Sequence, residues 1–307
     1  MKKDSKIFVA GHKGLAGSAI VRVLKDRGFT NVLTADRARC DLENTFKTLR
    51  FFNWEKPEFV FLCAAKVGGI LANKNNPVDF MVRNLRIQTN VLEAASKYGV
   101  EKLLFLGSAC AYPKHAECPV KESALLTGPL EESNECYALA KISGVKLCDA
   151  YRAQYSRNFI SAMPTNLYGP GDHYDPRDSH VIPGMIRRLH NARGGGYATL
   201  WGTGKPTREF LFSEDLARAC LVLMEKYNSA GTINVGTREP VPLRGLAELV
   251  AYTVGYKGPI LWDSSKPDGT PHRSLNSSKV FELGWRPEMS LACGLDIAYR
   301  DFLCQLR

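Results

Sequence analysis

Short, mostly apolar runs alternate with longer amphipathic stretches through the first half of this sequence of 307 residues. The apolar runs cover residues 6–10, 31–35, 59–65, 102–108 and 159–164, whereas residues 18–27 and 84–98 have the spacing of amphipathic helices. Runs without polar alternation are typical of strands covered on both faces of a parallel sheet. The alternation predicts an α/β fold with a doubly wound parallel sheet, whose ligands bind beyond the carboxyl ends of the strands.

The first apolar run leads directly into a glycine-rich loop, Gly11-His12-Lys13-Gly14-Leu15-Ala16-Gly17, which a helical pattern follows. Glycines allow a tight turn and a close approach of the backbone to a diphosphate, and the helix N-terminus attracts the anion. Such a loop alone is a weak signal. It gains weight because the second run ends in Asp36-Arg37, about where a ribose-binding acid is expected in a Rossmann-like fold.

The length and the 45% hydrophobic content allow a full Rossmann-like core and a smaller second domain. We expect residues 1–165 to form the dinucleotide-binding domain, with returning segments near residues 210–236. Residues 166–307 should mainly form a smaller α/β domain that binds the substrate.

A phenol and an ammonium group lie one helical turn apart at Tyr137 and Lys141. A neighbouring ammonium stabilises phenolate and should bring the pKa of Tyr137 toward the range useful for proton transfer. Chance produces this spacing on many amphipathic helices, so the pair needs context. Ser108 and Cys110 supply it, because they follow the fourth predicted strand and, two apart in an extended chain, should point to the same side.

Eight motifs extend this context over nearly the whole chain. They are Ala10–Ser18, Ala64–Ile70, Leu104–Pro113, Tyr137–Lys141, Pro164–Pro170, Ser179–Pro183, Arg208–Leu211 and Ser265–Pro271. With these motifs the chain resembles the extended short-chain dehydrogenase/reductase family, and within it the enzymes that epimerise and reduce GDP-linked 4-keto sugars.

The resemblance implies NADPH-dependent conversion of GDP-4-keto-6-deoxy-D-mannose to GDP-L-fucose, by epimerisation at C3 and C5 and reduction at C4. It assigns Ser108, Tyr137 and Lys141 to the reduction, and Cys110 and His180 to the proton transfers at C3 and C5. Hydrogens next to a ketone are acidic, so a base on one face and an acid on the other can invert such a centre. Without the resemblance, Cys110 is expected to be a small buried side chain and His180 an exposed one.

The resemblance also implies the residues that bind NADP(H) and the GDP-sugar. For the cofactor they are the glycine loop (Gly11, His12, Lys13, Gly14, Leu15, Ala16, Gly17), Asp36, Arg37, Asp41, Leu42, Ala64, Ala65, Leu106, Gly107, Ser108, Tyr137, Lys141, Pro164, Thr165, Asn166, Leu167 and His180. For the substrate they are Asn166, Val181, Arg188, Trp201, Arg208 and Asp268. No metal site is expected.

Asp36 and the basic residues near it favour different coenzymes, NADH and NADPH respectively. Asp36 itself would accept a hydrogen bond from a ribose 2′-hydroxyl and favour NADH, whereas Lys13, Arg37 and Arg39 could bind a 2′-phosphate. Charge counting and the resemblance both favour NADPH.

Three alternatives remain beside this interpretation. A 4,6-dehydratase or simple 4-epimerase of the same fold is disfavoured, because dehydratases of this superfamily have an Asp-Glu pair where this chain has Ala109-Cys110. A non-catalytic dinucleotide sensor should have lost Tyr137 or Lys141. An enzyme for a related GDP-4-keto sugar, leading to GDP-colitose or a GDP-6-deoxyheptose, stays open because such enzymes share the chemistry.

The net charge of +10 is spread along the chain without long basic runs. Dispersed charge favours small polyanions such as a dinucleotide and a GDP-sugar, and we expect no nucleic-acid partner. Nine cysteines without CxxC spacing, and a polar start without a signal peptide, favour a reducing cytoplasm. No run approaches the roughly 20 apolar residues of a membrane helix. The family resemblance implies a homodimer that forms through the helices expected at 84–98 and 135–155.

Overall fold

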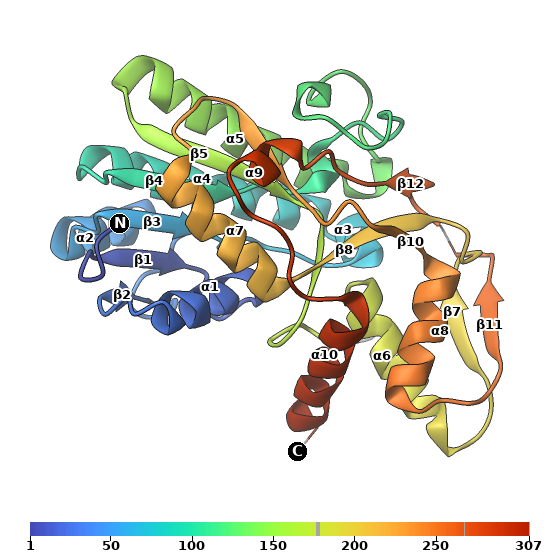
Figure 1. Ribbon diagram of the computed structural model, residues 1–307. Helices are drawn as coiled ribbons and strands as arrows, with labels where there is room; N and C mark the ends of the chain where they lie inside the picture. Colours follow the sequence, from blue (N-terminus) through green and yellow to red (C-terminus); the bar gives the residue numbers. More distant parts are fainter. Residues whose placement is uncertain (176–178, 267, 307) are drawn as a thin grey trace.

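The core of the protein is a six-stranded parallel sheet, seen in the computed structural model (Figure 1), which describes residues 1–175, 179–266 and 268–306. In spatial order the strands are β2 (Val32–Leu33), β1 (Ile7–Ala10), β3 (Phe59–Leu62), β4 (Lys102–Leu106), β5 (Asn158–Pro164) and β9 (Thr232–Val235). Each neighbouring pair is parallel. The predicted doubly wound parallel sheet is confirmed.

Helices cover both faces of this sheet, which explains the continuous apolar runs. On one face lie α1 (Leu15–Asp26) and α7 (Ser213–Lys226); on the other lie α2 (Thr45–Glu55), α4 (Pro77–Lys97) and α5 (Glu135–Tyr155). Successive side chains of a strand point to opposite faces. In β1, Ile7 and Val9 therefore pack toward α1, whereas Phe8 and Ala10 pack toward the other helices.

Several predicted boundaries were wrong for local physical reasons. Helix α4 begins at Pro77 instead of residue 84, because a proline fits the first helical turn, where its missing N–H has no partner to lose. Strands β3 and β4 end at Leu62 and Leu106, a few residues early, where the chain leaves the sheet, after β4 into a 3₁₀ turn. A short helix, α3 (Ile70–Asn75), was not predicted.

The strand order reverses between β1 and β3, which makes this edge of the sheet the switch point where ligands bind in such folds. Two glycines keep it open. Gly11 has a φ of +88°, and a Cβ at Gly11 would lie 2.6 Å from the Ala64 nitrogen. A Cβ at Gly17 would lie 2.2 Å from the Gly11 carbonyl oxygen. Only glycine permits this contact between the loop, α1 and β3.

The remaining elements build a smaller body beside the sheet (Figure 1). Strand β8 (Thr207–Phe212) pairs with β6 (Asn166–Tyr168), β10 (Pro240–Pro242) and β12 (His272–Arg273), and β7 (Ala198–Trp201) pairs with β11 (Ile260–Asp263). The smaller body has a hydrophobic core of its own, in addition to the cores on the two faces of the six-stranded sheet. It is formed in part by α6 (Val181–Asn191), α8 (Leu243–Val254) and α10 (Leu291–Gln305).

The chain returns to the first body twice after residue 165. Helix α7 and strand β9 lie in this body, and α9 (Ser278–Glu282) adds Val280 to the core beside α1, where Trp285, just after the helix, also packs. The domain boundary itself stays a prediction. In the described part of the chain, no helix is both long and apolar enough to cross a membrane.

A buried lysine joins β4 to the end of α7. Lys102 is 4% exposed, and its Nζ donates to the carbonyl oxygens of Leu223 and Met224 at 2.9 and 2.8 Å and to Asn228 Oδ1 at 3.0 Å. The last carbonyls of a helix lack intrahelical donors, and a cation there also complements the helix dipole. Burial lowers the pKa of Lys102 to about 8, so its charge carries a desolvation cost that these bonds offset.

We expect Lys102→Met to lower the free energy of unfolding by about 1–3 kcal/mol, because the carbonyls of Leu223 and Met224 lose their charged donor. Urea unfolding at pH 7 measures the effect. Lys257→Met, at an exposed lysine, is the control and should change little. A variant at Lys102 as stable as the parent would show that desolvation cancels the hydrogen bonds.

Candidate active site

The carboxyl ends of four strands bring the predicted cofactor residues to one edge of the sheet. The glycine loop follows β1, Ala64 and Ala65 follow β3, Gly107 follows β4, and Thr165 follows β5. Gly14 caps α1 without a side-chain bond, which leaves N–H groups of the first turn unpaired by any cap. A close-packed glycine turn at a helix N-terminus fits a dinucleotide diphosphate, so the residues present fit the cofactor.

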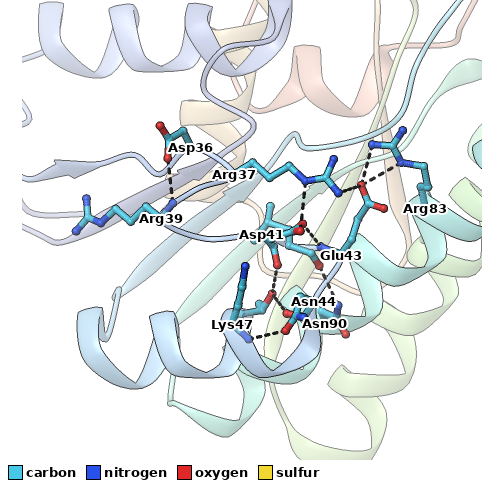
Figure 2. A network of polar contacts seen from close by, with 11 residues as sticks. Asp36, Arg37, Arg39, Asp41, Glu43, Asn44, Lys47, Arg83 and Asn90 are labelled. Atoms are coloured by element: carbon cyan, nitrogen blue, oxygen red, sulfur yellow. Dashed lines mark hydrogen bonds and ion pairs between the residues drawn. The ribbon is translucent and has the colours of Figure 1, made fainter.

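Polar contacts fix the loop between β2 and α2 (Figure 2). Asp36 Oδ1 accepts from the Arg39 backbone nitrogen at 3.0 Å, and its Oδ2 lies 4.0 Å from Lys13 Nζ. The backbone N–H of Arg39 is the main cause that lowers the pKa of Asp36. The loop thus lies beside the glycine loop, with its acid held in the charged form.

The two arginines of this loop point in different directions (Figure 2). Arg39 donates to the Thr34 carbonyl oxygen at 3.3 Å and pairs with Glu55 on α2. Arg37 instead contacts Asp41 and Glu43. All three predicted cations for a 2′-phosphate are thus paired with acids, and the side chains of Lys13 and Arg37 are more exposed than that of Arg39, at 74% and 65% against 52%.

Lys141 and Tyr137 lie where α5 passes the end of β4. Lys141 is buried, and its Nζ donates to the Leu106 carbonyl oxygen at 2.6 Å and lies 5.9 Å from the centre of the Tyr137 ring. Burial lowers the pKa of Lys141 to about 8. The Tyr137 ring packs edge-on against Phe80 of α4, with ring centres 6.2 Å apart.

The expected lowering of the Tyr137 pKa by Lys141 is wrong for this structure. Burial raises the pKa of Tyr137 above its ordinary value, a negative charge on Cys110 raises it further, and a hydrogen bond with Ser108 lowers it. The ammonium group is directed at the Leu106 carbonyl instead. The phenol is therefore protonated at neutral pH, which is the state that a proton donor requires.

Ser108 and Cys110 belong to a tight turn and not to an extended segment as predicted. Ser108 caps a 3₁₀ turn, η1 (Ala109–Ala111), and its Oγ accepts from the Cys110 backbone nitrogen at 3.2 Å. The turn still brings both residues to Tyr137, because Ser108 hydrogen-bonds to the phenol and Cys110 interacts with it electrostatically. Serine, cysteine and tyrosine therefore share one site.

Two arginines, the buried Arg273 and the partly buried Arg208, lie within electrostatic reach of Cys110. Burial lowers the pKa of Arg208 and of Arg273, and a negative charge on Cys110 would raise both. Arg273 donates to the Pro113 carbonyl oxygen at 3.1 Å, just after the turn that carries Cys110. Both guanidinium groups therefore lie close enough to Cys110 to interact with it electrostatically.

The predicted substrate residues form two contacts. Arg188 of α6 lies over the Trp201 ring at 4.6 Å, and Arg208 Nη2 donates to the Asp268 carbonyl oxygen at 3.2 Å. Asn166 Nδ2 donates to the Glu209 carbonyl oxygen at 2.9 Å. The sixth predicted substrate residue, Val181, opens α6 and is 40% exposed, and His180, predicted as a catalytic and cofactor residue, directly precedes this helix. The functional roles of all these residues stay predictions.

Sequence reasoning missed Arg273, which the structure places beside the predicted site. Strand β12 pairs with β8 in a register that sets Arg273 against Arg208. A long-range register of this kind leaves no local signal in the sequence, although the adjacent motif Ser265–Pro271 marks the segment. Across the described ranges, no cluster of three or more His, Cys, Asp or Glu side chains could hold a metal ion.

A doubly wound sheet with a glycine loop and a Tyr-Lys pair at its carboxyl edge defines a dinucleotide-dependent enzyme of the short-chain dehydrogenase/reductase class. The chain belongs to the NAD dependent epimerase/dehydratase family, whose pattern matches residues 7–236.

Comparison with individual relatives indicates which enzymes of this family the chain resembles. The chain is 52% identical over 303 residues to GDP-L-fucose synthase 1 of Arabidopsis thaliana, covering 98% of this chain and 94% of the relative. It is 35% identical over 302 residues to GDP-L-colitose synthase of Yersinia pseudotuberculosis, covering 97% and 98%. Its fold matches the GDP-mannoheptose C4 reductase of Campylobacter jejuni with NADP bound, with a TM-score of 0.90, 35% identity and 99% of each chain covered.

The pKa of Lys141 leads to a prediction for ketone reduction. Below pH 8 Lys141 is protonated, and as the pH rises through about 8 the charge beside Tyr137 is lost. We therefore expect kcat/KM for reduction to fall above this pH, approaching roughly tenfold per pH unit. Lys141→Arg keeps the positive charge at all these pH values. The fall in kcat/KM above pH 8 should therefore be absent in this variant, even if its overall rate is lower than that of the parent. If kcat/KM of Lys141→Arg falls at the same pH, a group other than Lys141 causes the fall.

Proposed function

We propose that the protein converts GDP-4-keto-6-deoxy-D-mannose to GDP-L-fucose with NADPH, as an epimerase at C3 and C5 and a reductase at C4. The observation that carries this proposal is the position of Cys110 beside Ser108 and Tyr137 and within electrostatic reach of Arg208 and Arg273. A reductase alone needs no base there. The similarity to GDP-L-fucose synthase 1 over 98% of the chain supports the same activity.

Epimerisation requires a base and an acid on opposite faces of the sugar. Cys110 is the base in this proposal, because it lies beside Tyr137 and within electrostatic reach of two guanidinium groups. It removes the proton from C3 or C5, and the 4-keto group delocalises the resulting charge. His180, at the exposed start of α6, returns a proton from the other face.

Reduction follows at C4 in the same site. When bound, NADPH supplies the hydride. Tyr137 is protonated at neutral pH and donates its proton to the developing alkoxide, while Ser108 supplies a hydrogen bond. Lys141 holds its positive charge 5.9 Å from the centre of the Tyr137 ring, on the side of the phenol where the phenolate remains after proton transfer, although burial and not this cation dominates the pKa of Tyr137.

Incubation with GDP-4-keto-6-deoxy-D-mannose and NADPH, followed by NMR of the sugar product, tests the proposal. GDP-L-fucose is the expected product. GDP-6-deoxy-talose or GDP-rhamnose, the unepimerised alcohols, would show reduction without epimerisation, and no turnover would reject the substrate.

An enzyme for a related GDP-4-keto sugar is the second candidate, because a colitose enzyme and a heptose enzyme are each 35% identical to this chain over nearly its whole length. The contact between Arg188 and Trp201 and that between Arg208 and Asp268 do not include the sugar carbons, so they do not separate these substrates. Competition between the keto sugars for turnover separates them. Higher kcat/KM with the 3,6-dideoxy or heptose substrate would favour this candidate.

Cys110→Ser separates the two half-reactions. We expect it to slow deuterium uptake at C3 and C5 in D₂O by at least about a hundredfold, because a hydroxyl is a much poorer base than a thiolate. NMR of the recovered keto sugar measures the uptake. Cys293→Ser, at an exposed cysteine of α10, is the matched control. Unchanged uptake in Cys110→Ser would mean that another group removes these protons.

We also propose a homodimer formed through α4 and α5. These helices pack side by side, with Gln88 donating to the Ala140 carbonyl oxygen at 2.8 Å. Each presents an incompletely buried apolar stripe at helical spacing, and the two stripes are Val78, Met81, Val82 and Leu85 on α4, and Leu139 and Leu147 on α5. Such a surface is suited to an isologous contact with a second copy.

Leu139→Arg tests this interface, because a charge in the middle of an isologous contact faces its own copy or loses its solvation. Light scattering of the eluting protein should give twice the chain mass for the parent and a single chain mass for Leu139→Arg at low micromolar concentration. Leu261→Arg, on β11, is the control at a similarly exposed leucine. A dimeric Leu139→Arg would place the interface elsewhere, and a monomeric parent would reject the dimer.

A reducing cytoplasm is the proposed location. All nine cysteines are free, and Cys40, Cys148 and Cys220 are buried as thiols. Disulfide-free chains with many thiols are typical of reducing compartments. Fluorescence of the tagged full chain in cells of its source tests this location, and a secreted or organellar signal would contradict it.

A further inference from the structure

An ionic chain connects Arg37 to helix α4 through Glu43 (Figure 2). Arg37 Nε donates to Asp41 Oδ2 at 3.3 Å, and its Nη2 lies 3.5 Å from Glu43 Oε1. Arg83 on α4 donates to the same Glu43 oxygen from Nε at 3.0 Å and from Nη2 at 2.8 Å. No sequence motif singled out Glu43 or Arg83.

The acidic end of this chain is held firmly. The Glu43 side chain is 16% exposed, and its backbone nitrogen donates to Asp41 Oδ1 at 3.2 Å. Asn90 of α4, about two helical turns beyond Arg83, donates to the Leu42 carbonyl oxygen at 2.9 Å and so holds the same loop. Helix α4 therefore holds the loop between β2 and α2 in place, and this loop holds the carboxylates of Asp41 and Glu43 in place.

The basic end faces solvent. The Arg37 side chain is 65% exposed, yet two of its nitrogens are directed at Asp41 and Glu43. A free arginine side chain must lose much rotamer freedom when it binds a phosphate, and a side chain that is already ordered loses less. The nitrogen that these acids do not contact, Nη1, stays available to an anion.

We propose that Glu43 and Arg83 are positioning residues for coenzyme selectivity: they order Arg37 for the 2′-phosphate of NADPH. This proposal rests on the coenzyme assigned above and goes beyond it, because neither residue needs to touch the coenzyme. Glu43 could have the opposite effect, since a carboxylate next to Arg37 also lowers the positive potential available to a phosphate. The sign of the effect of removing the Glu43 charge separates the two roles.

Calorimetric titration of the full chain with 2′,5′-ADP and with 5′-AMP isolates the 2′-phosphate without any sugar substrate. Glu43→Gln keeps the shape and an acceptor oxygen but removes the charge that holds Arg37. We expect it to weaken binding of 2′,5′-ADP by about threefold to tenfold and to leave 5′-AMP unchanged, as expected for freeing one arginine side chain. Arg83→Met should act in the same direction, because Glu43 loses its anchor.

Two comparisons make the test specific. In an Arg37→Ala background, Glu43→Gln should have no further effect on 2′,5′-ADP, because the residue through which it acts is gone. Glu93→Gln, at an exposed glutamate of α4, is the matched control and should bind as the parent does. Thermal unfolding of each variant verifies that the fold is intact.

The outcomes separate the inference from the coenzyme assignment. Equal affinity of the parent for 2′,5′-ADP and 5′-AMP would overturn both. Discrimination in the parent that is unchanged or stronger in Glu43→Gln would overturn the positioning role alone. A loss of affinity in Glu43→Gln that persists in the Arg37→Ala background would also overturn it, because Glu43 would then act independently of Arg37.

Discussion

The buried carboxyl group of Glu209 joins the two bodies of the protein. Its two oxygens accept from the backbone nitrogens of Arg238 and Leu275, both at 2.8 Å, and its side chain is fully inaccessible to solvent. Its own carbonyl oxygen accepts from Thr165 at 3.0 Å and from Asn166 at 2.9 Å, just beyond β5. Burial raises the pKa of Glu209, and hydrogen bonds from backbone N–H groups lower it. These hydrogen bonds therefore offset part of the desolvation cost of the buried carboxyl group. The carboxyl edge of the sheet, the turn after β9 and the segment before α9 meet at this residue.

The site depends on that junction. Because Glu209 holds Leu275, the segment of β12 lies against β8, and the pairing sets Arg273 beside Arg208. The Arg273 guanidinium lowers the pKa of the neighbouring Arg208, so the arrangement is costly without an anion between or beside them. A thiolate at Cys110 and the phosphates of a nucleotide-sugar are anions of this kind. The buried carboxyl group thus maintains a local excess of positive charge that the proposed chemistry uses.

The sequence predicted the parts of this structure that are encoded by neighbouring residues. The strand, glycine turn and helix around Gly11 form one continuous segment, and α5 was predicted from Glu135 to Tyr155 with the bounds that it has. The pairing of Arg273 with Arg208 and the anchoring of Glu43 by Arg83 join residues far apart in the chain, and no periodicity reveals them. Local geometry was also misjudged at Ser108, where a hydroxyl that accepts from the Cys110 nitrogen favours a turn over an extended strand end. The pKa of Tyr137 was misjudged because burial, which the sequence does not show, outweighs a cation directed elsewhere.

In the mechanism proposed above, Cys110 as the base and Tyr137 as the proton donor share one pocket, so they must not neutralise each other. The thiol and the phenol are coupled, since a negative charge on Cys110 raises the pKa of Tyr137. Ionisation of the base therefore strengthens the hold of the donor on its proton, so the phenol does not protonate the thiolate. Arg208 and Arg273 lie near the sulfur, whereas Lys141 lies on the Tyr137 side and is bound to the Leu106 carbonyl. Separate cations thus serve the two groups. Epimerisation can then precede reduction without any change in the protonation of Tyr137, and the phenol gives up its proton only when an alkoxide forms at C4.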